Sequence, residues 1–231
     1  MTNLVLVPGL LCTDALFRHQ IDALGGRVAI TVGDHRRSDT LAGIAEGLLA
    51  AAPERFALAG LSMGGYVAFE ILRQAPERVE RLALLDTSAR ADQPEQSEMR
   101  GRLVSLARRK GVRAAQMQLL PRLIAPEAQH DARLVDLIMT MAEATGVEAF
   151  ARQQAAIAAR PDSRPLLANI SCPATVIVGS DDVLTPPAVA AEIAAGIAGS
   201  RLIEIDGAGH LSSLERPEAV TDALRSWLSG D

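Results

Sequence analysis

The amino-acid sequence predicts an α/β fold, a doubly wound and mostly parallel sheet of about six strands with a helical lid inserted after the fourth strand. Short apolar runs of strand length recur along the chain with little polar alternation, which is typical of a parallel sheet buried on both faces. Amphipathic segments of helical period separate most of these runs, and one long region contains helical patterns alone.

The expected strands and helices follow one another in regular alternation. The strands are expected at residues 4–7, 28–32, 56–59, 82–85, 175–178 and 202–205. The helices between and after them are expected at residues 15–24, 41–51, 66–74, 187–197 and 217–228. Thr185 before Pro186 predicts an N-cap with proline at the first helical position, so the preceding loop should lead directly into a helix.

The alternation stops between residues 88 and 165, where apolar residues at helical spacing predict consecutive amphipathic helices. The three patterns are Met99-Leu103-Leu106, Leu134-Ile138-Met141 and Val147-Phe150-Ile157. We therefore divide the chain into a core of residues 1–87 and 166–231 and a helical cap or lid of residues 88–165. Four of the six methionines fall in this segment, and their flexible thioethers either line an adaptable pocket or fill gaps between small helices. These methionines are Met99, Met117, Met139 and Met141.

Composition and charge disfavour several classes of partner. The chain has 231 residues, a net charge of −5 and few aromatic residues, which argues against nucleic acid and against an anionic membrane surface. No uncharged apolar stretch approaches the length of a membrane span, and the N-terminus lacks a basic leader. Cys12 and Cys172 lie in separate segments, as expected for reduced thiols in a cytoplasmic protein. The single lysine, Lys110, lies in a charged run and is a poor candidate for Schiff-base chemistry.

Ser62 is the strongest candidate for a reactive side chain. It lies in the stretch Gly60-Leu61-Ser62-Met63-Gly64, between an apolar run of strand length and a helical segment. A turn this sharp holds its central residue in a strained conformation and leaves space for glycine alone at the flanking positions. The N–H groups at the start of the following helix would face a developing oxyanion, so the pattern indicates acyl transfer.

Ser62 and two further segments, Gly179-Ser180-Asp181-Asp182 and Gly207-Ala208-Gly209-His210, resemble the α/β-hydrolase superfamily in the chain order serine, acid, histidine. The similarity covers nearly the whole chain. In that superfamily a helical cap commonly follows the sixth strand, which is similar to the place of the lid here. The first strand of this chain would match the third strand of the family, so we expect a shortened sheet.

A serine hydroxyl needs a base within hydrogen-bond reach, and the base needs an acceptor on its other nitrogen. His210 is the leading base, because it follows the last expected strand through a glycine-rich loop. His19, His35 and His130 are interpreted as surface or packing residues, and none pairs with another His or Cys at metal-ligand spacing. No metal site and no cofactor are therefore predicted.

Asp182 is the candidate acid, at the end of the strand where the resemblance places the acid of similar hydrolases. The adjacent Asp181 is the competing residue, since successive loop residues point in different directions and only one should reach His210. Asp86 is a second alternative, because it ends an expected strand and some members of the superfamily carry their acid there.

The resemblance also implies an oxyanion hole made of two backbone N–H groups, that of Met63 and that of Leu10. Leu11 is the alternative second donor. Many members of the superfamily have His-Gly ahead of this donor, whereas this chain has Pro8 and Gly9.

The leading functional hypothesis is a cofactor-independent serine hydrolase that cleaves a small carboxylic ester, thioester or lactone through an acyl-serine intermediate. One alternative keeps the triad but breaks a carbon–carbon bond or uses peroxide in place of water. Another is a non-catalytic ligand-binding protein that keeps the pocket. The fold leaves the acyl chain, the leaving group and the oligomeric state open, since one architecture supports many reactions.

Overall fold

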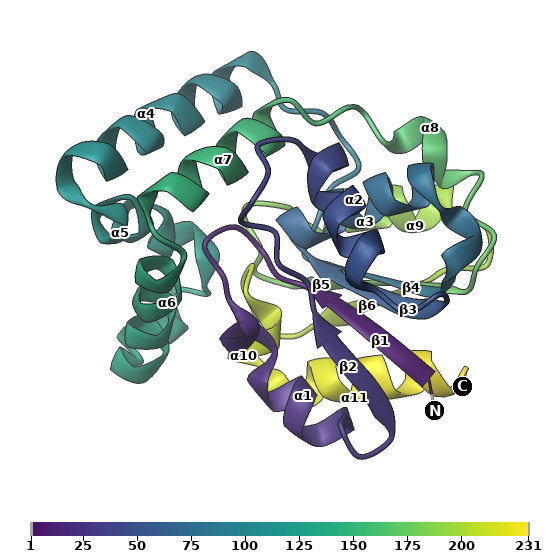
Figure 1. Cartoon of the computed structure of the whole chain (residues 1–231). Coiled ribbons are helices and arrows are strands. Elements are labelled where there is room, and N and C mark those ends of the chain that lie inside the picture. Colours follow the sequence, from purple (N-terminus) through teal and green to yellow (C-terminus); the bar gives the residue numbers. More distant parts are fainter. Residues whose placement is uncertain (1, 231) are drawn as a thin grey trace.

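The computed structural model describes residues 2–230 and contains a six-stranded, all-parallel sheet in the order β2-β1-β3-β4-β5-β6 (Figure 1). This confirms the predicted α/β fold class and the number of strands. All six expected strands are present, with ends that differ from the prediction by no more than three residues. The strands are β1 (Thr2–Val7), β2 (Val28–Val32), β3 (Phe56–Leu61), β4 (Val79–Leu85), β5 (Ala174–Gly179) and β6 (Arg201–Ile205).

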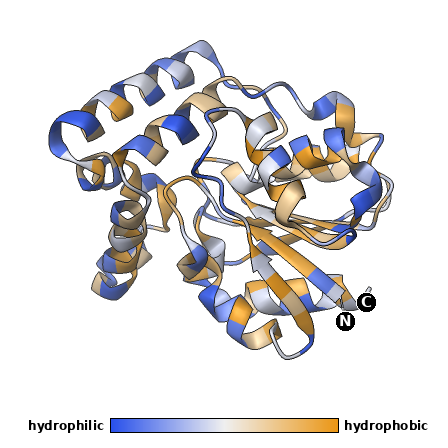
Figure 2. Cartoon of the chain, viewed as in Figure 1, coloured by the Kyte–Doolittle hydropathy of each residue, from blue (hydrophilic) through white to orange (hydrophobic). Residues whose placement is uncertain are grey.

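Helices cover both faces of the sheet. The first layer contains α2 (Leu41–Ala51), α3 (Met63–Gln74), α8 (Arg164–Leu167) and α9 (Pro187–Gly196), and the second contains α1 (Arg18–Leu24) and α11 (Pro217–Ser229) (Figure 1). Successive strand residues point to opposite layers, so Val5 packs in the cluster of the first layer and Leu4 in that of the second. In Figure 2 the central strands are coloured mostly as hydrophobic.

Burial on both faces holds for the interior of the sheet but not for its edges. β3 and β5 are buried at every position, whereas the edge strands β2 and β6 alternate or lie largely exposed, with Leu202 of β6 42% exposed. The edges have a neighbouring strand on one side only, and the helical layers do not reach over them fully. The prediction of continuous burial is therefore wrong for β2 and β6.

Two helix predictions need correction. The segment expected as one helix at residues 15–24 is a 3-10 turn, η1 (Asp14–Phe17), followed by α1. Helix α9 begins at Pro187 with Pro186 as its N-cap, so Thr185 does not cap it. The Thr185 hydroxyl donates instead to the side chain of Asp182.

Four helices lie between β4 and β5 and are called the inserted helices: α4 (Pro94–Lys110), α5 (Val112–Leu123), α6 (Ala132–Thr145) and α7 (Val147–Ala158). A 3-10 turn, η3 (Glu127–His130), joins α5 to α6. Figure 1 shows the group beyond the carboxyl ends of the strands, with α4 alongside α7. The apolar patterns predicted α4, α6 and α7 but missed α5, whose last turn contains Pro121, a residue that normally ends a helix.

No helix within residues 2–230 combines the length and the apolar character that crossing a bilayer requires.

The four methionines of the inserted helices separate into two pairs. Met139 and Met141 are buried in the cluster that contains the second face of the sheet, and therefore fill space. Met99 and Met117 are each 49% exposed.

We expect Met139→Ala to lower the free energy of unfolding by roughly 2 to 5 kcal/mol, because truncation of a fully buried methionine leaves a cavity. Met117→Ala is the matched control, and we expect a change within about 0.5 kcal/mol for that exposed side chain. Urea unfolding followed by circular dichroism measures both. Equal losses in the two variants would contradict the packing role of Met139.

Candidate active site

Ser62 occupies a strained turn between β3 and α3, with φ 55° and ψ −112°. A Cβ atom added at Gly60 would overlap the carbonyl group of Gly64, and one added at Gly64 would overlap the carbonyl oxygen of Val7. The Ser62 N–H donates to the Leu85 carbonyl at 2.9 Å, which fixes the turn against the end of β4. The close approach of these backbones leaves the serine side chain directed away from the sheet, as the sequence pattern predicts.

His210 links this serine to an aspartate. Its Nε2 lies 2.8 Å from Ser62 Oγ and its Nδ1 lies 2.8 Å from Asp182 Oδ2. The loops after β5 and β6 meet so closely that a Cβ at Gly179 would overlap the carbonyl oxygens of Ala208 and Gly209. Glycine at this position therefore lets the two loops bring the aspartate and the histidine together.

Asp182 accepts hydrogen bonds on both carboxylate oxygens. Oδ1 accepts from the N–H groups of Leu184 (2.8 Å) and Thr185 (3.0 Å), and Oδ2 accepts from the Thr185 hydroxyl at 2.7 Å as well as facing His210. Burial acts to raise the pKa of Asp182, but the charge of His210 and these donors outweigh it and hold the pKa below its ordinary value. The sequence did not predict that Thr185 donates to the aspartate. The signal for it was the position of Thr185, three residues after Asp182.

The pairing of Asp182 with His210 also determines the protonation state of the imidazole. Burial disfavours the charged form of His210, yet the charge of Asp182 and its hydrogen bond raise the pKa of His210 above its ordinary value. A donated Nδ1–H to the carboxylate leaves Nε2 of the neutral ring as an acceptor for the Ser62 hydroxyl.

The two alternative acids lie elsewhere. Asp181 is exposed, and its side chain accepts only from the neighbouring Ser180 hydroxyl among the described contacts. Asp86 is buried, with its Oδ1 accepting from the Gly179 N–H at 2.8 Å and its Oδ2 from the Ser212 hydroxyl. Neither carboxylate contacts His210 through a hydrogen bond, so only Asp182 is brought to the histidine.

The loop after β1 presents a free amide next to Ser62. Leu10 lines the same cavity as Ser62, and within residues 2–230 neither its N–H nor that of Met63 donates to a protein acceptor. The Leu11 N–H instead donates to Gln153 Oε1 of α7 at 3.2 Å, and Leu11 has a positive φ of 58°. The Leu11 N–H, the alternative donor for the oxyanion hole, is therefore already hydrogen-bonded within the protein.

Two contacts that the sequence did not predict hold this loop. His35 is buried and its Nε2 lies 2.8 Å from the Gly9 carbonyl oxygen, so it is a packing residue with a specific partner. The side chain of Leu11 is fully buried in a cluster with Leu103 and Phe150 of the inserted helices. His19 and His130, by contrast, are at least partly exposed, as expected.

Glu215 is a further buried acid that sequence reasoning missed. It accepts from the Ala125 N–H at 2.7 Å and from the Gly209 N–H at 2.9 Å. Burial raises its pKa despite these donors. The carboxyl group joins the segment after α5 to the residue that precedes His210, so it fixes the histidine loop to the inserted helices.

A cavity of about 610 Å³ lies between the sheet and the inserted helices, and Ser62 and His210 form part of its wall. Among the described residues, Met99 is the one methionine that lines this cavity. The opposite wall carries polar and charged residues of α4, α5 and α7, and of the segments before and after them: Arg90, Gln93, Glu95, Gln96, Arg100, Gln116, Arg122, Gln154 and Arg160. Across residues 2–230, no three His, Cys, Asp or Glu side chains gather at a spacing suited to a metal ion.

The site contains a serine, a histidine and a buried aspartate in line. They lie at the carboxyl ends of parallel strands and beside two free backbone amides. This is the arrangement of an α/β hydrolase. The model of the Alpha/beta hydrolase family matches residues 4–223, and the chain belongs to that family.

Three relatives show the extent of the likeness. A putative non-heme bromoperoxidase of Mycobacterium tuberculosis is 33% identical over 186 residues, which cover 77% of this chain and 69% of that protein. A malate-bound thermophilic esterase from Thermogutta terrifontis is 31% identical with a TM-score of 0.92, covering 100% of this chain and 90% of that chain. An enol-lactonase from Burkholderia xenovorans LB400 is 29% identical with a TM-score of 0.89, covering 99% and 91%.

The buried Asp86 gives a testable dependence of stability on pH. Burial, which outweighs its hydrogen bonds and the nearby charge of His210, raises the pKa of Asp86 from 3.8 to about 7. The folded protein then binds more protons than the unfolded chain between these values, so the free energy of unfolding falls as the pH rises from about 4 to about 7.

We expect Asp86→Asn to reduce the decrease in the free energy of unfolding over this pH range. One titrating group changes that free energy by at most about 1.4 kcal/mol per pH unit. Asp181→Asn, an exposed aspartate, is the control. Urea unfolding at intervals between pH 4 and pH 8 measures the slopes, and equal slopes in wild type and Asp86→Asn would contradict the raised pKa.

Proposed function

We propose that this protein is a serine hydrolase that cleaves a small carboxylic ester, thioester or lactone through an acyl-Ser62 intermediate. The observation that carries the proposal is the continuous chain from Ser62 Oγ through His210 to Asp182, with 2.8 Å at each link. An esterase and an enol-lactonase among the structural relatives support the same class of substrate.

In the proposed first step, Nε2 of neutral His210 accepts the proton of the Ser62 hydroxyl while Oγ attacks the carbonyl carbon of the substrate. Asp182 holds the ring in the required tautomer and stabilises the imidazolium that forms. Since the pKa of His210 is raised, the base is lost to protonation as the pH falls through that value, and the rate should fall with it.

The tetrahedral intermediate places a negative charge on the former carbonyl oxygen. We assign its stabilisation to the N–H groups of Met63 and Leu10, which have no protein acceptor among the described residues. The positive end of the α3 dipole adds to them, because Met63 is the first residue of that helix.

Collapse of the intermediate transfers the proton from His210 to the leaving alcohol, thiol or lactone hydroxyl and leaves an ester on Ser62. Water then attacks the acyl-enzyme with His210 as base, which releases the acid and restores the serine. The inserted helices form the wall opposite Ser62 and are proposed to act as the lid that selects the acyl group.

Perhydrolysis is a second candidate, favoured by the likeness to a putative non-heme bromoperoxidase. It uses the same acyl-enzyme, with hydrogen peroxide in place of water in the second step, so the two candidates differ only in the acceptor.

We expect Ser62→Ala to lower kcat for p-nitrophenyl esters by at least about 10³-fold, since the nucleophile is lost. A fluorophosphonate should label wild type at Ser62, as mass spectrometry of the peptides will reveal, and should leave the variant unlabelled. Peracid formation on addition of hydrogen peroxide to the same assay separates perhydrolysis from hydrolysis. Full esterase activity in Ser62→Ala would refute the acyl-Ser62 mechanism.

Asp182→Asn should lower kcat by on the order of 10² to 10⁴-fold, because an amide favours the wrong imidazole tautomer. Asp181→Asn and Asp86→Asn should keep most of the activity, since neither carboxylate bonds to His210. Steady-state kinetics on the best p-nitrophenyl ester compare the three variants. A silent Asp182→Asn together with a crippled Asp86→Asn would assign the acid to Asp86.

A further inference from the structure

The cavity beside Ser62 is lined by an excess of positive charge in a protein whose net charge is −5. Arg90, Arg100, Arg122 and Arg160 all contribute to the lining, and the acidic residue among the lining residues is Glu95, which is exposed in the first turn of α4. A cleft lined by one sign of charge concentrates ligands of the opposite sign.

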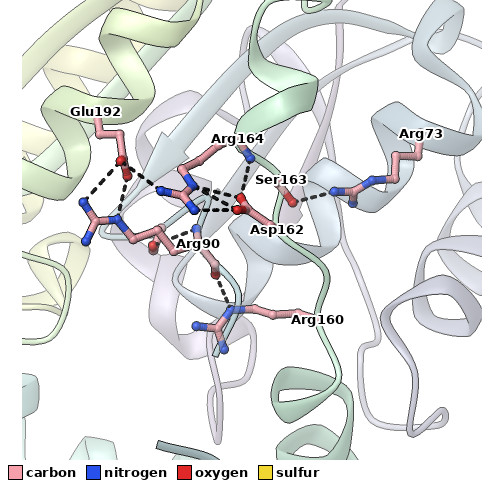
Figure 3. A network of polar contacts seen from close by, with 8 residues as sticks. Arg73, Arg90, Arg160, Asp162, Ser163, Arg164 and Glu192 are labelled. Carbon is pink, nitrogen blue, oxygen red and sulfur yellow. Dashed lines mark hydrogen bonds and ion pairs between the residues drawn. The ribbon is translucent and has the colours of Figure 1, made fainter. Parts of the chain in front are cut away.

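Two of these arginines are mainly structural. Figure 3 shows Arg90 paired with Glu192, and Arg160 donating to the Arg90 carbonyl oxygen. Arg160 also pairs with Asp92 and lies over the ring of Tyr66, 4.5 Å from its centroid. These contacts join the segment before α4 to the segment after α7, so Arg90 and Arg160 are occupied in holding the inserted helices to the core.

Arg100 and Arg122 retain free donors. Arg100 uses three of its five N–H groups, two on Asp92 and one on Gln154 Oε1, which leaves one on each terminal nitrogen. Asp92 serves both Arg100 and Arg160, so this cluster keeps one positive charge. Arg122 is exposed and has no hydrogen bond or ion pair to a protein group within the described chain.

Two buried glutamines are also among the lining residues, and each has one side-chain atom without a hydrogen-bond partner in the protein. Gln154 is 2% exposed, and its Nε2 has no partner although Arg100 holds its Oε1. Gln116 is also 2% exposed, and its Oε1 has no partner. Both of these atoms are shielded from the cavity, and a carboxylate, which only accepts hydrogen bonds, could not pair with Gln116 Oε1. The contribution of Gln154 is therefore to hold the Arg100 guanidinium through its Oε1.

We propose that Arg100, which Gln154 holds in place, and Arg122 bind a carboxylate group on the substrate, at the end of the acyl chain away from the scissile carbonyl. The substrate class is then the monoesters, thioesters or lactones of dicarboxylic or oxo-carboxylic acids. This inference rests on the proposed hydrolase function, because it takes Ser62 as the point of attack in the same cavity.

The test compares mono-p-nitrophenyl adipate, which carries a free carboxylate, with the neutral p-nitrophenyl hexanoate. We expect wild type to have the higher kcat/KM for the adipate ester, chiefly through a lower KM. The preference should fall about tenfold in Arg122→Gln, which removes one charge-assisted contact, and further in Gln154→Glu, which places a negative charge in the wall. Arg109→Gln is the matched control, because it removes an exposed arginine of α4 that does not line the cavity.

An equal or higher kcat/KM for the hexanoate ester in wild type overturns the inference, as does an unchanged preference in both cavity variants. If wild type hydrolyses neither ester, the proposed ester hydrolysis fails, and binding is then decided by the thermal stability of Ser62→Ala in free adipate. A rise in Tm that Arg122→Gln reduces supports the carboxylate site, and no rise in Tm overturns it.

Discussion

The left-handed backbone at Ser62 is the constraint on which the site depends. A non-glycine residue at φ 55° is unfavourable by itself, and it persists because the surrounding strands and helix leave the chain no other path. Gly60 and Gly64 let β3, α3 and the end of β1 approach to a distance that no side chain would permit. Leu10, in the loop after β1, lines the same cavity as Ser62.

The inserted helices do more than enclose this cavity. Gln153 of α7 takes the Leu11 amide, and the Leu11 side chain is packed in the core of those helices. Glu215 in turn joins the residue after Ile124 to the loop of His210. The loop with the free Leu10 amide and the loop of the histidine are therefore both held from the same side, so the geometry of the candidate site and the packing of the inserted helices are coupled.

Charge is distributed in two layers around the cavity. Close to Ser62, the negative Asp182 lies behind His210 and does not reach the cavity wall. On the far wall, arginines outnumber acids. Arg90, before the inserted helices, and Arg164, after them, both pair with Glu192 of α9, which lies outside this wall, as Figure 3 shows. A polarised cavity of this kind favours one orientation of a ligand with a neutral ester at one end and a negative charge at the other.

The sequence by itself determined the sheet, the order of its elements and the serine turn, because these depend on local apolar runs and on glycines whose role is read from neighbouring residues. It did not determine α5, whose last turn contains Pro121, or the partners of Asp86, Gln153 and Glu215, and it left the choice of Asp182 over Asp181 and Asp86 open. Asp181 and Asp182 are identical in type and adjacent in the chain, and only the packing of the loops after β5 and β6 buries one against His210 and leaves the other in water. The contacts that decide these choices join residues tens of positions apart, Asp182 to His210, Asp86 to Gly179, Gln153 to Leu11 and Glu215 to Ala125, and no local pattern encodes such distances.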